Sequence, residues 1–192
     1  AYRFIAKNIK PDEHLQLYEA MFEKYMAKEN VFQWLYSNFG KEVPGLDVPV
    51  LLKWYREHMP EIKLREGVIE FLEELKNHQV PLGLITDGRS ISQRNKLKAL
   101  KIEGFFDDII ISEEFGSEKP DPENYLYFVN KYGKRDYYYI GDNTGKDFLI
   151  PARLGWNIIC IKNAGANVHS QNFNDFPVSG TIMSSLNEIT LQ

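Results

Sequence analysis

The sequence predicts an α/β fold in which a parallel, Rossmann-like sheet carries helices on both faces and an all-helical segment precedes it. Three observations support this fold class. Residues 1 to about 64 show helical periodicity and no strand signal, whereas from about residue 65 short apolar runs alternate with amphipathic helices. These runs also lack polar alternation, as expected for strands covered on both faces. We therefore expect a helical unit over residues 1–64 and an α/β core over residues 65–192.

The helical unit carries three apolar stripes whose members are three or four residues apart, the spacing of one helix face. They consist of Leu15, Tyr18, Phe22 and Tyr25; of Val31, Leu35 and Phe39; and of Val50, Trp54 and His58. Gly40 would end the second helix, and Asp47 with Pro49 would begin the third.

The expected strands of the core are rich in β-branched, leucine or aromatic residues. They are Leu82 to Thr86, Asp108 to Ile111, Tyr137 to Ile140, Asn157 to Ile161 and, more weakly, Thr181 to Met183. Residues 163–180 are rich in Asn, Gly and Ser, and we expect a surface loop there.

Helices are expected between these strands. One passes through Val68, Leu72 and Leu75, and a second begins near Ser90. A third is capped by Asp121, has Pro122 in its first turn and ends before Gly133. Pro151 predicts a bend after the third strand, or a helix that begins at that proline.

Composition is that of a globular protein, with 43% hydrophobic and 14% aromatic residues in a chain of 192. No segment approaches the roughly 18 consecutive apolar residues of a transmembrane helix, and no secretory pattern opens the chain. Lys and Arg total 23 against 27 for Asp and Glu, a net charge of −4 without long runs, which argues against a nucleic-acid partner.

The single cysteine, Cys160, lies within an apolar run. It excludes an intrachain disulfide and a cysteine-rich zinc site, so a cytoplasmic setting is the default expectation.

Two carboxylates, Asp142 and Asp147, follow the third expected strand in the turn Gly141–Asp147. Ligands bind at the carboxyl ends of strands in open α/β sheets, and a carboxylate pair there needs a cation or a proton. Mg²⁺ suits such a pair, especially if a phosphate completes its shell. The alternative is a solvated turn, because Asp, Asn and Gly are common turn formers.

The first strand ends in Thr86, Asp87 and Gly88, ahead of a helix. A hydroxyl and successive backbone N–H groups at a helix start can cradle a phosphate. The alternative is an ordinary strand-to-helix turn capped by Ser90. Between the second strand and its helix, prolines stiffen the loop that carries Lys119, whose ammonium is either a phosphate counter-charge or simply solvated.

Taken together, Thr86, Lys119 and the pair Asp142 and Asp147 resemble the last three of the four motifs of the haloacid dehalogenase superfamily. The similarity extends to the segments Glu66–Leu72 and Leu154–Trp156, and the helical unit resembles a C1-type cap. The resemblance implies that Thr86 and Lys119 act in catalysis by binding the phosphoryl group, and that the acidic pair binds Mg²⁺.

Within that superfamily, the form Gly141–Asp142 is similar to the fourth motif of Mg²⁺-dependent phosphatases and phosphomutases. The resemblance therefore implies a Mg²⁺-dependent phosphatase that acts on a small phosphorylated metabolite, with no nucleic-acid or membrane partner. Two alternatives stay open: a phosphomutase with the same core, and a degenerate member that binds a phosphorylated ligand or a protein without turnover.

The resemblance also predicts a first motif, Asp-x-Asp, that no part of this sequence contains. Its first aspartate is the family's nucleophile and its second the acid/base, so the chain as written is expected to be inactive. The strand that carries this motif lies at the centre of the family's sheet. We therefore expect about 15 to 25 further residues before Ala1 in the natural protein.

Overall fold

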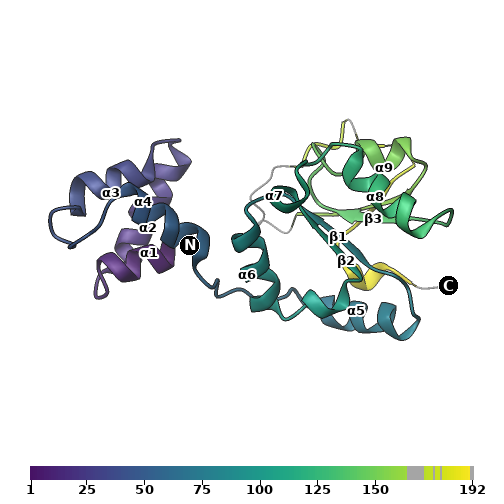
Figure 1. Cartoon of the computed structure of the whole chain (residues 1–192), viewed down its shortest axis with the longest axis horizontal. Helices are drawn as coiled ribbons and strands as arrows, with labels where there is room; N and C mark the ends of the chain where they lie inside the picture. Colours follow the sequence, from purple (N-terminus) through teal and green to yellow (C-terminus); the bar gives the residue numbers. More distant parts are fainter. Residues whose placement is uncertain (164–170, 175, 178, 191–192) are drawn as a thin grey trace. The chain divides into compact units, whose positions relative to one another are not determined.

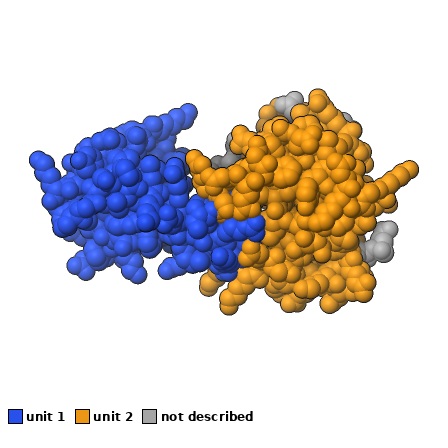
Figure 2. All heavy atoms as spheres, viewed as in Figure 1, with its two compact units in different colours: residues 1–62, 91–99 blue, residues 63–90, 100–192 orange. Residues whose placement is uncertain are grey.

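The computed structural model describes residues 1–163, 171–174, 176–177 and 179–190 (Figure 1). The remaining part of the loop expected over residues 163–180 lies outside the described residues. Contacts divide the chain into two compact units, residues 1–62 with 91–99, and residues 63–90 with 100–192 (Figure 2). In the described part of the chain, no helix is both long and apolar enough to cross a membrane.

The helical unit contains the helices that its periodicity predicts. They are α2 (His14–Met26), α3 (Val31–Phe39) and α4 (Val48–Glu57), and a further helix, α1 (Tyr2–Ile9), precedes them. Side-chain caps fix two starts: Asn30 accepts the N–H of Gln33 at 3.1 Å, and Asp47 accepts the N–H of Val50 at 2.7 Å. Gly40 ends α3, as expected.

The stripe that predicts α2 is not the buried face of that helix. Leu17 and Met21 face the core, whereas Leu15, Phe22 and Tyr25 are 57%, 46% and 47% exposed. The aromatic rings of this stripe pack against one another at the surface. Tyr18 and Phe22, four residues apart, stack with 6.3 Å between their ring centroids.

Residues 91–99 belong to helix α6 (Ser90–Leu100), yet they group with the helical unit. The amide of Asn95 explains this, since it donates to the carbonyls of Glu57 and His58 at 2.8 and 3.2 Å. These bonds satisfy the last carbonyls of α4 and the residue that follows it. The role of the helical unit as a cap stays a prediction.

The other unit contains the remaining helices and all five expected strands. Its helices are α5 (Val68–Asn77), α7 (Ser112–Phe115), α8 (Glu123–Tyr132) and α9 (Leu149–Arg153), with short 3₁₀ turns η1 (Glu103–Phe105) and η2 (Leu186–Glu188). Asp121 accepts the N–H of Glu123 at 2.9 Å, which confirms its capping role. Helix α9 begins two residues before Pro151, because a proline in a first turn forfeits no helical hydrogen bond.

The strands are β1 (Gly83–Thr86), β2 (Asp108–Ile111), β3 (Tyr138–Gly141), β4 (Asn157–Ile161) and β5 (Thr181–Met183). All pairings are parallel, as predicted, and they form two sheets, β1–β2 and β3–β4–β5. The resemblance places the central strand that would join them outside this sequence. In the described residues, β1 and β3 each have a strand partner on one edge only. Tyr138 and Ile140, which share one face of β3, are 65% and 37% exposed, so this strand is not covered on both faces as expected.

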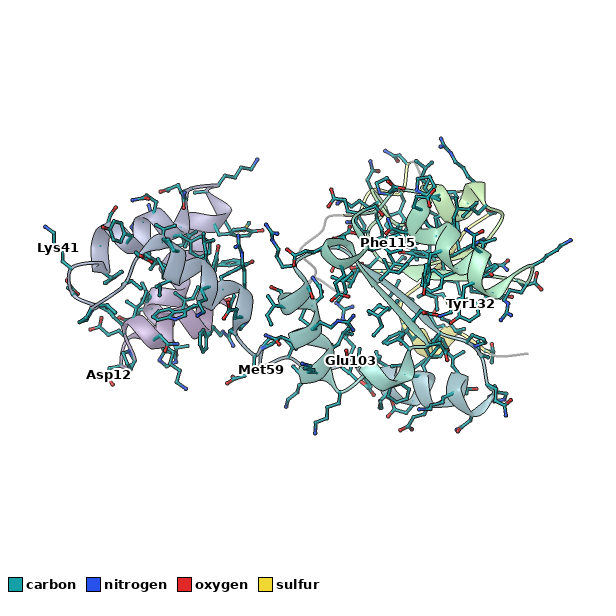
Figure 3. The ribbon with its side chains drawn as sticks, in the orientation of Figure 1. Asp12, Lys41, Met59, Glu103, Phe115 and Tyr132 are labelled. Carbon is teal, nitrogen blue, oxygen red and sulfur yellow. The ribbon has the colours of Figure 1, made fainter. Side chains whose placement is uncertain are left out.

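The carboxylate of Asp108, at the start of β2, holds helix α8 through hydrogen bonds and an ion pair. Asp108 accepts hydrogen bonds from the hydroxyls of Tyr127 and Tyr132 and from the ammonium of Lys131 at 2.6 Å. Tyr132, the last residue of α8, is labelled in Figure 3. Burial would raise the pKa of Asp108, but the bonds from Lys131 and the two tyrosines outweigh it and hold that pKa below its usual value.

Candidate functional site

Three turns that the sequence singles out meet in the α/β unit. The backbone N–H of Lys119 donates to Asp87 Oδ1 at 3.0 Å, and its ammonium donates to Asp147 Oδ1 at 2.7 Å. The ammonium of Lys146 lies 3.5 Å from Asp87 Oδ2. The structure thus brings together Asp87, Lys119 and Asp147 by direct bonds between the end of β1, the proline-flanked loop and the end of β3.

Asp147 is the hub of these contacts. It is only 3% exposed, and Oδ1 accepts the Lys119 ammonium and, at 3.4 Å, the hydroxyl of Tyr139. Oδ2 accepts the backbone N–H groups of Asp142 and Asn143 at 3.2 and 2.9 Å. A buried carboxylate requires this compensation. Asp147 therefore closes the acidic turn and holds Lys119, with one carboxylate performing both tasks.

The local sequence explains why this turn closes so tightly. Phe148 follows Asp147 and is 1% exposed, packed with Ile158 and Cys160, so it anchors the end of the turn. Gly141 begins the turn, and a Cβ atom there would lie 2.6 Å from Asp147 Oδ2. Only glycine lets the carboxylate come this close to the backbone of β3.

Replacing Gly141 with alanine is therefore expected to displace the Asp147 carboxylate and to lower the free energy of unfolding by about 1 to 3 kcal/mol. Gly145→Ala is the matched control in the same turn, because the nearest atom to its added Cβ would be Asn143 Oδ1 at 3.4 Å. Urea unfolding of both variants checks this. Equal stability of the two would contradict the close-approach argument.

In the turn after β1, side chains of the protein already accept backbone N–H groups. Thr86 is the last residue of β1, but the N–H of Gly88 donates to Ser112 Oγ at 2.9 Å and that of Ser90 to Glu113 Oε2 at 2.7 Å. Side chains from α7 thus occupy the N–H of Gly88, which was predicted to face a phosphate, and the first N–H of α6. Glu113 thus satisfies an N–H at the start of α6. The Asp87 carboxylate accepts the backbone N–H of Lys119 and pairs with the ammonium of Lys146. An ionised carboxylate has no hydrogen to donate, so a phosphate could use only the backbone N–H of Asp87.

The acidic turn suits Mg²⁺ in the type of donor it offers. Within the described residues there is no group of three or more His, Cys, Asp and Glu side chains that could hold an ion. Mg²⁺ does not need one, since proteins commonly hold it through one or two carboxylates, with waters and phosphate oxygens completing the octahedron. Asp142 is the better placed of the pair, because Lys119 already neutralises Asp147.

Sequence reasoning missed the tyrosines behind this site. Alternation along β3 puts Tyr139 on the face opposite Tyr138, and its hydroxyl reaches Asp147. Tyr125 of α8 is fully buried with its ring 5.5 Å from that of Tyr139. Burial, and then the charge of Asp147, raise the pKa of both hydroxyls, so each stays protonated and can only donate to a carboxylate.

A family model for haloacid dehalogenase-like hydrolases matches residues 3–161. Because this match covers most of the sequence, the chain belongs to that family, and the resemblance stated from its motifs is confirmed. The match includes both the helical unit and the turns that carry Thr86, Lys119 and Asp142.

Several curated relatives are phosphatases, among them the following two. A glyceraldehyde 3-phosphate phosphatase of Methanocaldococcus jannaschii is 31% identical over 143 residues, 73% of this chain and 63% of the relative. The human N-acylneuraminate-9-phosphatase is 31% identical over 96 residues, 49% of this chain and 38% of that protein. The chain thus spans less than two thirds of the length of these relatives.

A solved structure supports the fold. The HAD-hydrolase YfnB of Bacillus subtilis, bound to magnesium, superposes with a TM-score of 0.60 over 88% of this chain and 76% of its own, at 21% identity. This likeness establishes a shared α/β architecture of parallel strands and many helices.

Proposed function

We propose that this member of the haloacid dehalogenase-like hydrolases is a phosphatase that hydrolyses phosphate esters of small metabolites with the help of Mg²⁺. The observation that carries the proposal is the ammonium of Lys119, whose side chain is 14% exposed and which Asp147 holds at 2.7 Å beside the turn that follows β1. A nearly buried cation beside a helix start and an acidic turn is suited to an anion with a metal counter-ion. The names of the two phosphatase relatives described above agree with this.

Each residue then has a defined task. An ammonium has three N–H donors, so Lys119 can keep its bond to Asp147 and still donate to phosphoryl oxygens. Thr86 would donate its hydroxyl, and Asp87 its backbone N–H, to the same group. Asp142, with Asp147 behind it, would hold the metal, which supplies neutralisation of phosphoryl charge when bound.

Turnover also requires a nucleophile, and we propose that it is an aspartate on a strand lying between β1 and β3. Support comes from the unpaired edges of these two strands in the described part of the chain, and from the turns at their carboxyl ends. A parallel strand there would pair with both edges and deliver its own carboxyl end to Lys119 and Asp142.

The test is an assay of the full-length gene product with p-nitrophenyl phosphate and Mg²⁺. Turnover is expected to stop with a chelator and to fall on the order of 100-fold or more in Asp142→Asn, because a metal ligand acts on the transition state. Asp136→Asn removes an exposed carboxylate close to the same strand and should leave the rate unchanged. A full-length protein without turnover that still binds phosphate would favour the non-catalytic alternative.

A further inference from the structure

The side-chain amide of Gln171 links β3 and β4 just beyond their last paired residues. The register of this parallel pair ends at Gly141 opposite Cys160. The next carbonyl on each strand, of Asp142 and of Ile161, accepts a hydrogen bond from Gln171 Nε2, both at 2.8 Å. Gln171 Oε1 accepts the N–H of Asn163 at 2.7 Å. The amide of Gln171 thus acts in place of a missing peptide group.

The neighbouring residue holds the same turn at a second point. The N–H of Asn172 donates to Thr144 Oγ1 at 2.9 Å. Gln171 and Asn172 therefore hydrogen-bond the acidic turn at Asp142 and Thr144. Within the turn, Asp147 accepts the N–H groups of Asp142 and Asn143.

The consequence is greatest at Asp142. Its N–H is bonded to Asp147 and its carbonyl to Gln171, so side chains hold the peptide groups on both sides of its Cα. With both peptides fixed, the backbone dihedrals at Asp142 have little freedom, and these dihedrals determine which side-chain rotamers are open to its carboxylate. Only an amide of this length offers two donors to two carbonyls and an acceptor to a third group.

We infer that Gln171 is a positioning residue that sets the direction of the Asp142 carboxylate and thereby the affinity of the acidic turn for a divalent cation. This inference rests on the proposed function, because it assigns Asp142 to the metal. Residues that orient a metal ligand typically change metal affinity by roughly 10- to 100-fold when they are removed.

The experiment uses Mn²⁺ as the probe, because the electron paramagnetic resonance signal of the unbound ion reports binding directly. Gln171→Met keeps the length of the side chain without its hydrogen-bonding groups. Its matched control is Asn157→Leu, which removes a side-chain amide that bonds the Tyr137 carbonyl at 3.3 Å, at the opposite end of the same strand pair. Hydrogen exchange of the amides of residues 142–147 is measured in parallel on each protein.

Gln171→Met is expected to weaken Mn²⁺ binding by roughly 10-fold and to speed exchange in the turn, whereas Asn157→Leu changes neither. Unchanged affinity and exchange in a folded Gln171→Met protein would overturn the inference. If that variant does not fold, Thr144→Val, which removes only the acceptor for Asn172, must show the same two effects in smaller degree or the inference fails.

The two readouts separate this inference from the proposed function. Absence of Mn²⁺ binding in the unaltered protein would contradict the metal role of Asp142. Exchange would then decide the positioning role alone: faster exchange in Gln171→Met supports it, and unchanged exchange rejects it.

Discussion

Lys119→Met is expected to lower the free energy of unfolding by roughly 3 to 5 kcal/mol, because it leaves the buried carboxylate of Asp147 without its counter-ion. Asp147 would keep its two backbone donors and Tyr139, which are neutral and replace the lost ammonium only in part. In the full-length enzyme the same change is expected to reduce kcat/KM on the order of 100-fold or more, since the cation also serves the phosphoryl group. Urea unfolding and steady-state kinetics measure the two effects.

Two further variants test whether the stability lost in Lys119→Met comes from the uncompensated charge of Asp147 or from a nonspecific disturbance of the fold. Lys146→Met removes an exposed ammonium 3.5 Å from Asp87, and a surface pair of this kind is worth less than about 1 kcal/mol. Adding Asp147→Asn to Lys119→Met should recover part of the lost stability, because the uncompensated charge is then gone. A double variant no more stable than Lys119→Met would mean that the ion pair does not cause the loss.

Asp108→Asn is expected to destabilise the α/β unit at neutral pH by roughly 2 kcal/mol, since two tyrosine hydroxyls donate to this carboxylate. Its pKa is lower in the folded chain than its ordinary value, so its contribution is complete above about pH 4 and is lost as the pH falls through the folded pKa. The difference in stability between the two proteins should therefore shrink in acid.

Urea unfolding from pH 7 down to pH 2 tests this dependence. Asp136→Asn serves as the control, because that carboxylate is exposed and should show no such difference at any pH. A gap between Asp108→Asn and the unaltered protein that stays constant down to pH 2 would show that the ionised form of Asp108 is not what holds α8 to β2.

The sequence predicted the positions of helices and strands better than it predicted which side of each one is buried. Strands and helices with caps such as Asp47 and Asp121 follow from local chemistry, and all of them form. Periodicity alone could not decide that Phe22 lies at the surface and Met21 in the core, because both are apolar and only tertiary packing chooses between adjacent faces. The alternation of strands and helices predicted a parallel sheet, and the described strands pair in two sheets because one edge of β1 and one edge of β3 have no strand partner among the described residues.

The site divides in the same way. Motif order identified Lys119 and Asp147, and the turn after the first strand included Asp87; direct bonds join these three residues. It could not foresee that Glu113 and Ser112 occupy the N–H groups of the first turn, since α7 reaches that turn only through the tertiary fold. Tyr139 and Gln171 were missed for a related reason: nothing in their local sequence distinguishes them from an ordinary strand residue and an ordinary loop residue.

The bonds that join the three turns are long-range in sequence. Lys119 lies 32 residues from Asp87 and 28 residues from Asp147, so neither contact can form within one hairpin or one helix. The bonds within the acidic turn are local, four or five residues apart, whereas the joined site needs all three turns in place. A ligand that contacts all three turns therefore binds only chains in which the α/β unit has brought them together. By mass action, an anion or a cation at 100 times its dissociation constant would add about 2.7 kcal/mol to the stability of that whole unit. Recognition and folding are thus coupled in this protein through the same few hydrogen bonds.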